Sequence, residues 1–125
     1  MSTTVISTKN APAAIGPYSQ AVMTAGFLFC SGQLGIDPAS GELASGVKAQ
    51  AERVMSNLKA VAEAAGTNLD HIVKTTIFLT DMANFAVVNE VYGACFKGDK
   101  PARSTIAVAA LPKAGLVEIE AIFAL

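Results

Sequence analysis

The sequence predicts a single α+β domain in which two helices pack on one face of a mixed sheet of about six strands. Three observations support this fold class. The 125 residues suffice for one hydrophobic core. The predicted elements follow one another as strands, helix, strand, helix and two further strands. Hydrophobic residues make up 52% of the chain and charged residues 15%, a balance that excludes a disordered chain.

The first half of the chain is expected to begin with a short strand over 4–7 and a proline- and glycine-punctuated loop over 10–18. A hairpin follows, with strands over 20–24 and 27–31 joined across Ala25 and Gly26. Apolar residues then recur at helical spacing and predict an amphipathic helix that ends at glycine 66. They are Val47, Ala51, Val54, Met55, Leu58, Val61, Ala62 and Ala65.

In the second half, β-branched residues predict a strand over 72–80. Its alternation places four side chains on one face, namely Val73, Thr75, Ile77 and Leu79. A second helix is predicted over 83–96, with an apolar stripe of Phe85, Val88, Tyr92 and Phe96. Two strands, over 102–109 and 117–125, complete the predicted sheet.

Two helices can cover only one face of such a sheet. Alternation predicts that the other face carries several apolar side chains, namely Ala107, Ala109, Ile122 and Ala124. Because an uncovered apolar patch usually marks an interface, we expect an oligomer whose sheets pack against one another.

Charge and hydropathy exclude several classes of partner. The 9 basic and 10 acidic residues give a formal net charge of -1, which argues against nucleic acid or an anionic membrane as a partner. No apolar run approaches the 18 residues that a membrane span needs. The N-terminal residues lack the pattern of a signal peptide, so a cytoplasmic location is expected.

Signatures of metal and cofactor chemistry are also missing. The one histidine, His71, cannot form a two-histidine metal site within a subunit and is expected to be solvated. Cys30 and Cys95 have no CxxC spacing and are expected to be ordinary buried thiols. The chain contains no phosphate-binding or dinucleotide-binding glycine motif and no nucleophile elbow.

Polar residues that interrupt an apolar pattern often have a function. Asn89 lies within the stripe of the second predicted helix. It is either a hydrogen-bonded residue in the core or at the edge of the stripe, or a donor directed at a ligand. On the strand over 102–109, Arg103 and Thr105 are expected on the uncovered face, opposite Ser104, Ile106 and Val108. Arg103 is either a solvated edge residue or an anchor that binds a carboxylate through two parallel N–H bonds.

The last strand has two acidic residues, Glu118 and Glu120, that alternate with apolar ones. This alternation places both carboxylates on the uncovered face, where Arg103 is also expected. Both carboxylates are solvated, or they pair with Arg103 across strands or subunits, or one of them is left free to orient and deprotonate a water molecule. A substrate anchored by Arg103 and attacked by water activated by a glutamate would make a small-acid hydrolase site.

Several motifs, taken in order, resemble those of the RidA family (YjgF/YER057c/UK114), the reactive-intermediate deaminases that act on enamines and imines. The resemblance extends over nearly the whole of residues 1–125 and implies that they form a single RidA-like domain. The motifs are Asn10-Ala11-Pro12-Ala13-Ala14-Ile15-Gly16-Pro17-Tyr18-Ser19-Gln20, Ser31-Gly32-Gln33, Ile72-Val73-Lys74-Thr75-Thr76, Val88-Asn89, Pro101-Ala102-Arg103-Ser104, Leu111-Pro112-Lys113 and Glu118-Ile119-Glu120-Ala121.

The resemblance implies a chorismate-mutase-like fold and a homotrimer whose sheets form a central barrel, with active sites between neighbouring subunits. It implies hydrolysis of 2-iminopropanoate and 2-iminobutanoate to 2-oxo acids and ammonia, without a metal or organic cofactor. Small 2-imino and 2-oxo acids would be the ligands. By position, Arg103 would bind the substrate carboxylate and Glu118 would position the attacking water. The other substrate-binding positions are Tyr18, Ser31, Gly32, Asn89 and Thr105, whereas Gln33 is expected to be structural.

Two features depart from the family pattern. Thr105 stands where many relatives have cysteine, which removes a reactive thiol, and the loop over 97–100 is short and could alter the rim of the cleft. Two other functions remain open. One is an endoribonuclease or translation inhibitor, which the near-neutral charge and the lack of a basic stripe disfavour. The other is a non-catalytic, small-acid-binding or chaperone-like trimer, which the presence of both Arg103 and Glu118 disfavours.

Overall fold

The computed structural model describes residues 2–125. Within these residues, six strands form one sheet in the order β1-β2-β3-β6-β4-β5. The strands are β1 (Thr4–Ile6), β2 (Ala21–Thr24), β3 (Phe27–Leu34), β4 (Ile72–Leu79), β5 (Ala102–Ala107) and β6 (Val117–Ala124). The helices are α1 (Val47–Ala64) and α2 (Phe85–Gly93), with 3-10 turns η1 (Leu69–His71), η2 (Met82–Asn84) and η3 (Pro112–Ala114).

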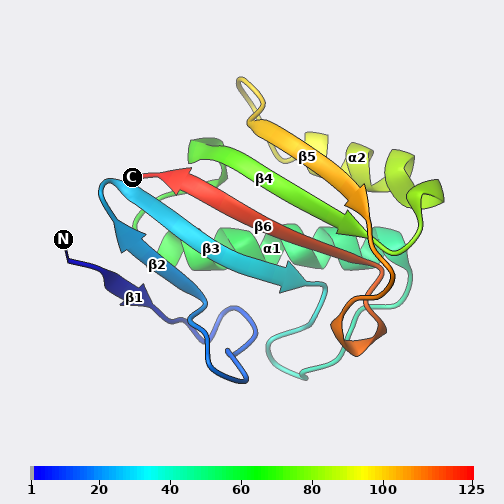
Figure 1. Cartoon of the computed structure of the whole chain (residues 1–125), viewed down its shortest axis with the longest axis horizontal. Helices are drawn as coiled ribbons and strands as arrows, with labels where there is room; N and C mark the ends of the chain where they lie inside the picture. Colours follow the sequence, from blue (N-terminus) through cyan, green and yellow to red (C-terminus); the bar gives the residue numbers. More distant parts are fainter. Residues whose placement is uncertain (1) are drawn as a thin grey trace.

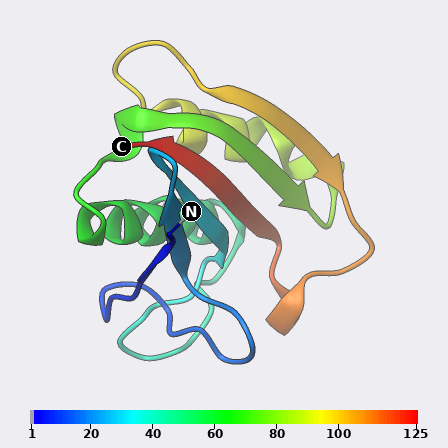
Figure 2. The same ribbon diagram turned by 60° about the vertical axis from the view of Figure 1, so that its left-hand side comes forward.

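Both helices lie on the same side of the sheet, behind it in the view of Figure 1. Turning the molecule shows the curved sheet with α1 and α2 on one side (Figure 2). The α+β architecture with two helices on one face, predicted from the sequence, is therefore confirmed. Among residues 2–125, none of the helices combines the length and the apolar character needed to cross a bilayer.

The strand pairing is antiparallel except between β4 and β5, which run parallel. Parallel neighbours need a crossover connection, and α2 supplies it. The predicted hairpin is confirmed as β2 and β3. Its two turn residues, Ala25 (φ 52°) and Gly26 (φ 82°), have the positive φ angles that fit the right-handed twist of paired strands.

The core lies between the sheet and the helices. Helix α1 contributes Val54, Leu58 and Val61, all fully buried, as its periodicity predicts. Gly66 follows the helix with φ 82°, the left-handed conformation that ends helices, so the predicted stop is also confirmed. The sheet contributes fully buried side chains of β3 and β6, namely Leu28, Val117, Ile119 and Phe123.

The predicted helix over 83–96 is shorter than expected. The 3-10 turn η2 precedes it, and the α-helical part ends at Gly93. Most of its apolar stripe is confirmed, because Val88, Tyr92 and Phe96 are buried, but Phe85 is 37% exposed. Phe85 lies at the first turn of α2, and its ring faces Arg103 of the edge strand instead of the core.

The predicted face of β4 is wrong at one residue. A register shift between Ile72 and Lys74 marks a β-bulge, and Val73 within it is 42% exposed. Ile72 takes the buried place that alternation assigns to Val73, while Thr75, Ile77 and Leu79 are buried as predicted. A bulge shifts the side-chain alternation by one residue, which simple period-two counting does not detect.

The facing of β5 is also opposite to the prediction. Arg103 and Thr105 are paired in register with the buried residues Thr75 and Ile77 of β4. Paired residues share a face, so Arg103 and Thr105 lie on the helix-covered side. Ser104 and Ile106, which were expected on the helix-covered side, lie on the uncovered face. Ala107, which was expected on the uncovered face, lies on the helix-covered side. Val108 and Ala109 lie beyond the end of β5. Since β5 is an edge strand with little burial on either side, its apolar residues do not indicate the core.

The uncovered side of the sheet, hereafter the open face, is apolar as predicted. One row of register-paired residues crosses it from β1 to β6, namely Val5, Val22, Phe29 and Ile122. Val5, Phe29 and Ile106 are 61%, 44% and 45% exposed. Several large apolar side chains therefore face solvent in a single chain, an arrangement typical of an interface.

The cysteines and the histidine fit their predicted structural roles in part. Cys30 is buried and Cys95 is half-buried, and both are free thiols. Burial raises the pKa of Cys30 to about 12, so this thiol is unreactive at neutral pH. His71 is exposed, as predicted, and its Nδ1 lies 2.9 Å from Oγ1 of Thr67.

Candidate active site

Arg103 is held by helix α2. Its Nη1 donates a hydrogen bond of 2.5 Å to Oδ1 of Asn89. Its guanidinium carbon lies 5.5 Å from the ring centre of Phe85 and 5.3 Å from that of Tyr92, which is within cation–π range. Because Arg103 is otherwise exposed, its remaining N–H groups are available to an acidic ligand.

Asn89 is exposed on α2 and is not a core residue. Its side-chain oxygen accepts the bond from Arg103, and this contact explains why a polar residue occurs within the apolar stripe. The side-chain NH2 group of Asn89 is left as a second donor beside the guanidinium. Asn89 thus lies beside Arg103, the residue predicted to bind the substrate carboxylate.

Thr105 faces the helix-covered side, two residues beyond Arg103, and pairs with Ile77 of β4. Its Oγ1 is buried and has no hydrogen-bond partner among residues 2–125. In a single chain this hydroxyl is therefore closed to a ligand. Any substrate contact at this position would have to use the main chain of the edge strand.

Glu118 belongs to a different region of the chain. It is half-buried on β6 and lines a cavity of about 710 Å³ together with Tyr18, Ser31 and Gly32. Burial raises the pKa of the Glu118 carboxyl above its usual value, and the negative charge of Glu120 raises it further. A carboxylate with a raised pKa in a cavity is suited to accept a proton from water.

Gly32 allows Glu118 to occupy this position. A Cβ atom on residue 32 would lie 2.9 Å from Cδ and 3.1 Å from Cγ of Glu118. The glycine lies in an irregular part of β3, where the register with β6 shifts between Cys30 and Gln33. The close approach of the carboxylate to the backbone at this bulge therefore requires the absence of a side chain.

Tyr18 and Ser31 also line this cavity. Tyr18 is 53% exposed in the loop before β2. The Ser31 hydroxyl donates a 2.6 Å hydrogen bond to the carbonyl of Ser19, which ties the loop to the bulged strand. The structure thus brings four predicted site residues together around one cavity, namely Tyr18, Ser31, Gly32 and Glu118.

Arg103, Asn89 and Thr105 do not line this cavity. Glu118 is paired in register with Phe78 of β4. The alternation of side chains along β6 places Glu118 on the open face, as predicted. Arg103 lies on the opposite face, so the prediction that these two groups share a face is wrong. One chain therefore contains two separate halves of the predicted site, one around Arg103 and one around Glu118.

Sequence reasoning missed Gln20. This residue is buried, and its amide nitrogen donates to the carbonyls of Thr8, Ala11 and Pro12 while its amide oxygen accepts from the backbone N–H of Thr8. It therefore fixes the loop that carries Tyr18. Gln20 ends the longest of the quoted motifs, but neither its type nor its spacing indicates this role.

Gln50 and Asn57 on α1 were also missed. Gln50 is buried and donates to the carbonyl of Ala44 at 3.0 Å, and it accepts from the N–H of Leu116 at 2.8 Å. Asn57 donates to the carbonyls of Leu34 and Ile36. These bonds hold the two loops that flank the cavity. Both residues lie within the apolar stripe of α1, at the spacing that singled out Asn89 on α2, so this signal was present in the sequence.

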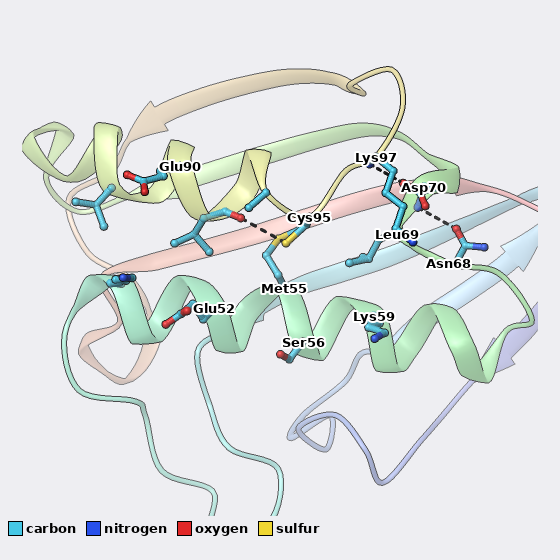
Figure 3. Close-up of a pocket in the computed structure, with 14 residues that line it drawn as sticks. Glu52, Met55, Ser56, Lys59, Asn68, Leu69, Asp70, Glu90, Cys95 and Lys97 are labelled. Carbon is cyan, nitrogen blue, oxygen red and sulfur yellow. Dashed lines mark hydrogen bonds between the residues drawn. The ribbon is translucent and has the colours of Figure 1, made fainter.

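A further groove of about 970 Å³ lies between α1 and α2. Figure 3 shows Met55 and Cys95 between the two helices, with charged side chains along the edges. None of the predicted site residues lines this groove. Among residues 2–125, no group of three or more histidine, cysteine, aspartate or glutamate side chains could hold a metal ion.

The fold and the two clusters define a small α+β protein with an exposed arginine held by α2 and a separate cavity with a half-buried carboxylate. The family model described as endoribonuclease L-PSP matches residues 8–125. The chain belongs to this family, whose solved structures include RidA and YjgF proteins.

Individual relatives are similar over almost the whole chain. Protein DfrA of Myxococcus xanthus is 56% identical, covering 98% of this chain and 95% of the relative. The 2-iminobutanoate/2-iminopropanoate deaminase of Mus musculus is 51% identical, covering 94% of this chain and 88% of the relative. The crystal structure of RidA from Psychrobacter sp. PAMC 21119 is 52% identical, with a TM-score of 0.95 and coverage of 98% and 99%.

Proposed function

We propose that this protein hydrolyses 2-iminopropanoate and 2-iminobutanoate to the 2-oxo acids and ammonia. Such imines arise from the enamines that PLP-dependent serine/threonine dehydratases release. The observation that carries the proposal is the half-buried Glu118 carboxylate, whose pKa is raised, at a cavity formed with Tyr18, Ser31 and Gly32. The deaminase name of mammalian relatives at about 50% identity supports the same reaction.

The substrate carboxylate is assigned to Arg103. Its guanidinium is exposed, already oriented by Asn89 and two aromatic rings, and carries N–H groups that none of these contacts uses. A guanidinium binds a planar carboxylate through two parallel N–H bonds, which fixes the direction of the rest of the molecule. This fixed direction places the C=N carbon at a defined distance from the anchor.

The two half-sites are joined by assembly. Since Arg103 and Glu118 lie on opposite faces of one sheet, we propose that Arg103 of one chain meets Glu118 of a second chain. The assembly proposed is a homotrimer whose open faces pack together. The exposed Phe29 and Ile106 side chains support burial of this face, because such apolar area is stabilised by removal from water.

The proposed chemistry needs no cofactor. Glu118 takes a proton from water while the water oxygen bonds to the imine carbon, and the C=N electron pair moves to nitrogen, which becomes protonated. The resulting carbinolamine passes its hydroxyl proton, through Glu118, to the amine nitrogen, and the C–N bond then breaks so that ammonia leaves as the C=O bond forms. An imine is already electrophilic, so positioning contributes most of the acceleration.

The test couples a serine or threonine dehydratase to this protein and follows the rate at which the imine disappears. Arg103→Ala should reduce the acceleration by roughly 10- to 100-fold, the usual effect of losing charge-assisted hydrogen bonds. Arg53→Ala, which removes a half-buried arginine of α1, is the matched control and should retain the full rate. An unchanged rate in the Arg103 variant would overturn the assignment.

RNA cleavage is measured on the same preparations, because the family description includes an endoribonuclease. The formal net charge of -1 provides little of the phosphate attraction on which RNA binding depends. We expect no cleavage that depends on Glu118. The deaminase proposal would be contradicted if the wild-type protein cleaved RNA, if Glu118→Gln abolished this cleavage, and if the wild-type protein had no effect on imine hydrolysis.

A further inference from the structure

We infer that Tyr92, itself fixed by Thr75, is the positioning residue that orients the Arg103 guanidinium for carboxylate binding. The inference rests on the proposed function, because it assigns a role to the surroundings of the proposed anchor. It concerns two buried side chains that would touch no substrate. Tyr92 and Thr75 would act through Arg103 alone.

The first observation is the contact between Tyr92 and Arg103. The guanidinium carbon lies 5.3 Å from the centre of the Tyr92 ring. Phe85 and Asn89, which also contact Arg103, precede Tyr92 on α2 by seven and three residues. Residues at this spacing lie along one side of a helix, so α2 presents two rings and an amide oxygen to the same guanidinium.

The second observation is that Tyr92 itself is fixed. Its hydroxyl oxygen lies 2.7 Å from Oγ1 of Thr75, and the two residues are 4% and 1% exposed. A buried hydroxyl is costly without a partner, so this bond restricts the tyrosine to one ring position. The ring also packs edge-on against Phe96 at 4.9 Å, which supports it from the side of the core.

The third observation concerns the place of Thr75 in the sheet. Thr75 is the register partner of Arg103 on the neighbouring strand β4. Thr75 is therefore both the neighbour of Arg103 in the sheet and the hydrogen-bond partner of Tyr92, whose ring lies against the guanidinium. Because Thr75 is adjacent to Arg103 in the sheet and bonded to Tyr92, it holds the tyrosine ring beside the strand position from which the Arg103 side chain extends.

This arrangement matters because Arg103 is an exposed residue on an edge strand. A free arginine side chain loses up to about 2 kcal/mol of rotamer entropy when it is fixed. Contacts that order it before the ligand arrives reduce that cost at the moment of binding. Tyr92 therefore acts on the binding of the acid, whereas the proton transfer assigned to Glu118 is unaffected.

The kinetic test uses the coupled imine assay with three variants of the pair. Tyr92→Leu removes the ring and should raise KM about three- to tenfold, the range of a partly exposed cation–π contact, with little change in kcat. Tyr92→Phe keeps the ring but loses the hydrogen bond to Thr75, so its KM should lie between those of the wild type and Tyr92→Leu. Thr75→Val, which removes the hydroxyl that fixes the ring, should give an intermediate KM.

A purely structural role of Tyr92 is tested by a matched control on the same helix. Val88 is as buried as Tyr92, and the contacts of Arg103 do not include it. Val88→Ala should lower the melting temperature without changing KM. If Tyr92→Leu changes KM no more than Val88→Ala does, the inference is wrong.

A second readout does not depend on the reaction. The Nε–H signal of Arg103 in an NMR spectrum of the free protein should show the most restricted motion in the wild type, more motion in Tyr92→Phe, which lacks the bond to Thr75, and the most motion in Tyr92→Leu. Equal motion in all three proteins overturns the inference. If this pattern is observed but the wild type neither hydrolyses the imine nor binds 2-oxobutanoate, the proposed function has failed while the positioning of Arg103 by Tyr92 stands.

Discussion

Arg103 and Glu118 lie on opposite faces of the same sheet. Arg103 pairs with Thr75 of β4, whose side chain is buried beneath the helices, whereas Glu118 pairs with Phe78 on the open face. The two groups therefore cannot act on one small molecule within a single chain. The proposed reaction consequently requires more than one copy of the chain, which leads to the first prediction.

Mixing two impaired variants should restore activity. Arg103→Ala chains retain Glu118, and Glu118→Gln chains retain Arg103, so a site between two chains can receive both intact groups. Random co-assembly at equal amounts should recover about a quarter of the wild-type rate, since each intact half comes from the right variant about half of the time. Imine hydrolysis is measured before and after joint refolding. A mixture that is no more active than the separate variants would contradict a shared site.

Glu118→Gln should reduce kcat by about 10²- to 10⁴-fold, the usual contribution of a general base. It should also stabilise the folded chain at neutral pH. Because the pKa of Glu118 is raised on folding above 4.5, the folded state binds more protons between the two pKa values, and stability falls as the pH rises through that window. Thermal unfolding at pH 4 and pH 7.5 measures the effect.

The wild-type rate should in turn rise with pH, with an acid limb above pH 4.5, because the base must be deprotonated. Glu52→Gln, a change on the exposed side of α1, serves as the control and should keep the wild-type pH profile. A profile without this limb would remove the support for Glu118 as the base.

Gly32→Ala should reduce activity at least tenfold without unfolding the protein. The new Cβ would meet Cδ of Glu118 at 2.9 Å, and the carboxylate, as the end of a flexible side chain, must move away from the cavity position. Gly98→Ala is the matched control, since a Cβ at residue 98 has no neighbour within 4 Å. Equal activity of the two variants would show that the position of Glu118 against Gly32 is unimportant. Rates and melting temperatures are measured together.

Phe29→Glu should prevent assembly. The Phe29 side chain is 44% exposed on the open face, and burial of an aromatic side chain contributes about 1.5–3 kcal/mol, whereas a buried unpaired carboxylate is strongly unfavourable. Met82→Glu, at an equally exposed residue in η2, should leave the oligomer intact. Light scattering after size-exclusion chromatography gives the mass of each. A wild-type monomer in solution would contradict the proposed interface.

Gln50→Leu should lower the free energy of unfolding by about 1–3 kcal/mol, because the backbone N–H of Leu116 and the carbonyl of Ala44 lose their partner. Glu63→Leu, on the exposed side of the same helix, should change it by less than about 0.5 kcal/mol. Urea unfolding followed by circular dichroism gives both values. A neutral effect of Gln50→Leu would mean that neither loop depends on this side chain.

The elements with strong periodicity could be predicted from the sequence alone. Helix α1 and strand β6 each carry an apolar repeat that matches their burial, because both pack against the core along their whole length. The same alternation placed Glu118 on the open face. For β5 this reasoning fails, because an edge strand is little buried on either face and its apolar residues do not show which way it faces.

The sequence alone therefore determined the fold class, the apolar open face and the types of residue available for chemistry, because burial and backbone propensity are encoded locally. Only the tertiary structure decided that Arg103 turns toward α2 and Glu118 away from it. That outcome depends on the register of β5 against β4 and on the position of an aromatic ring from a distant helix. Strand register and helix docking are set by contacts between residues far apart in the chain, which no local pattern contains.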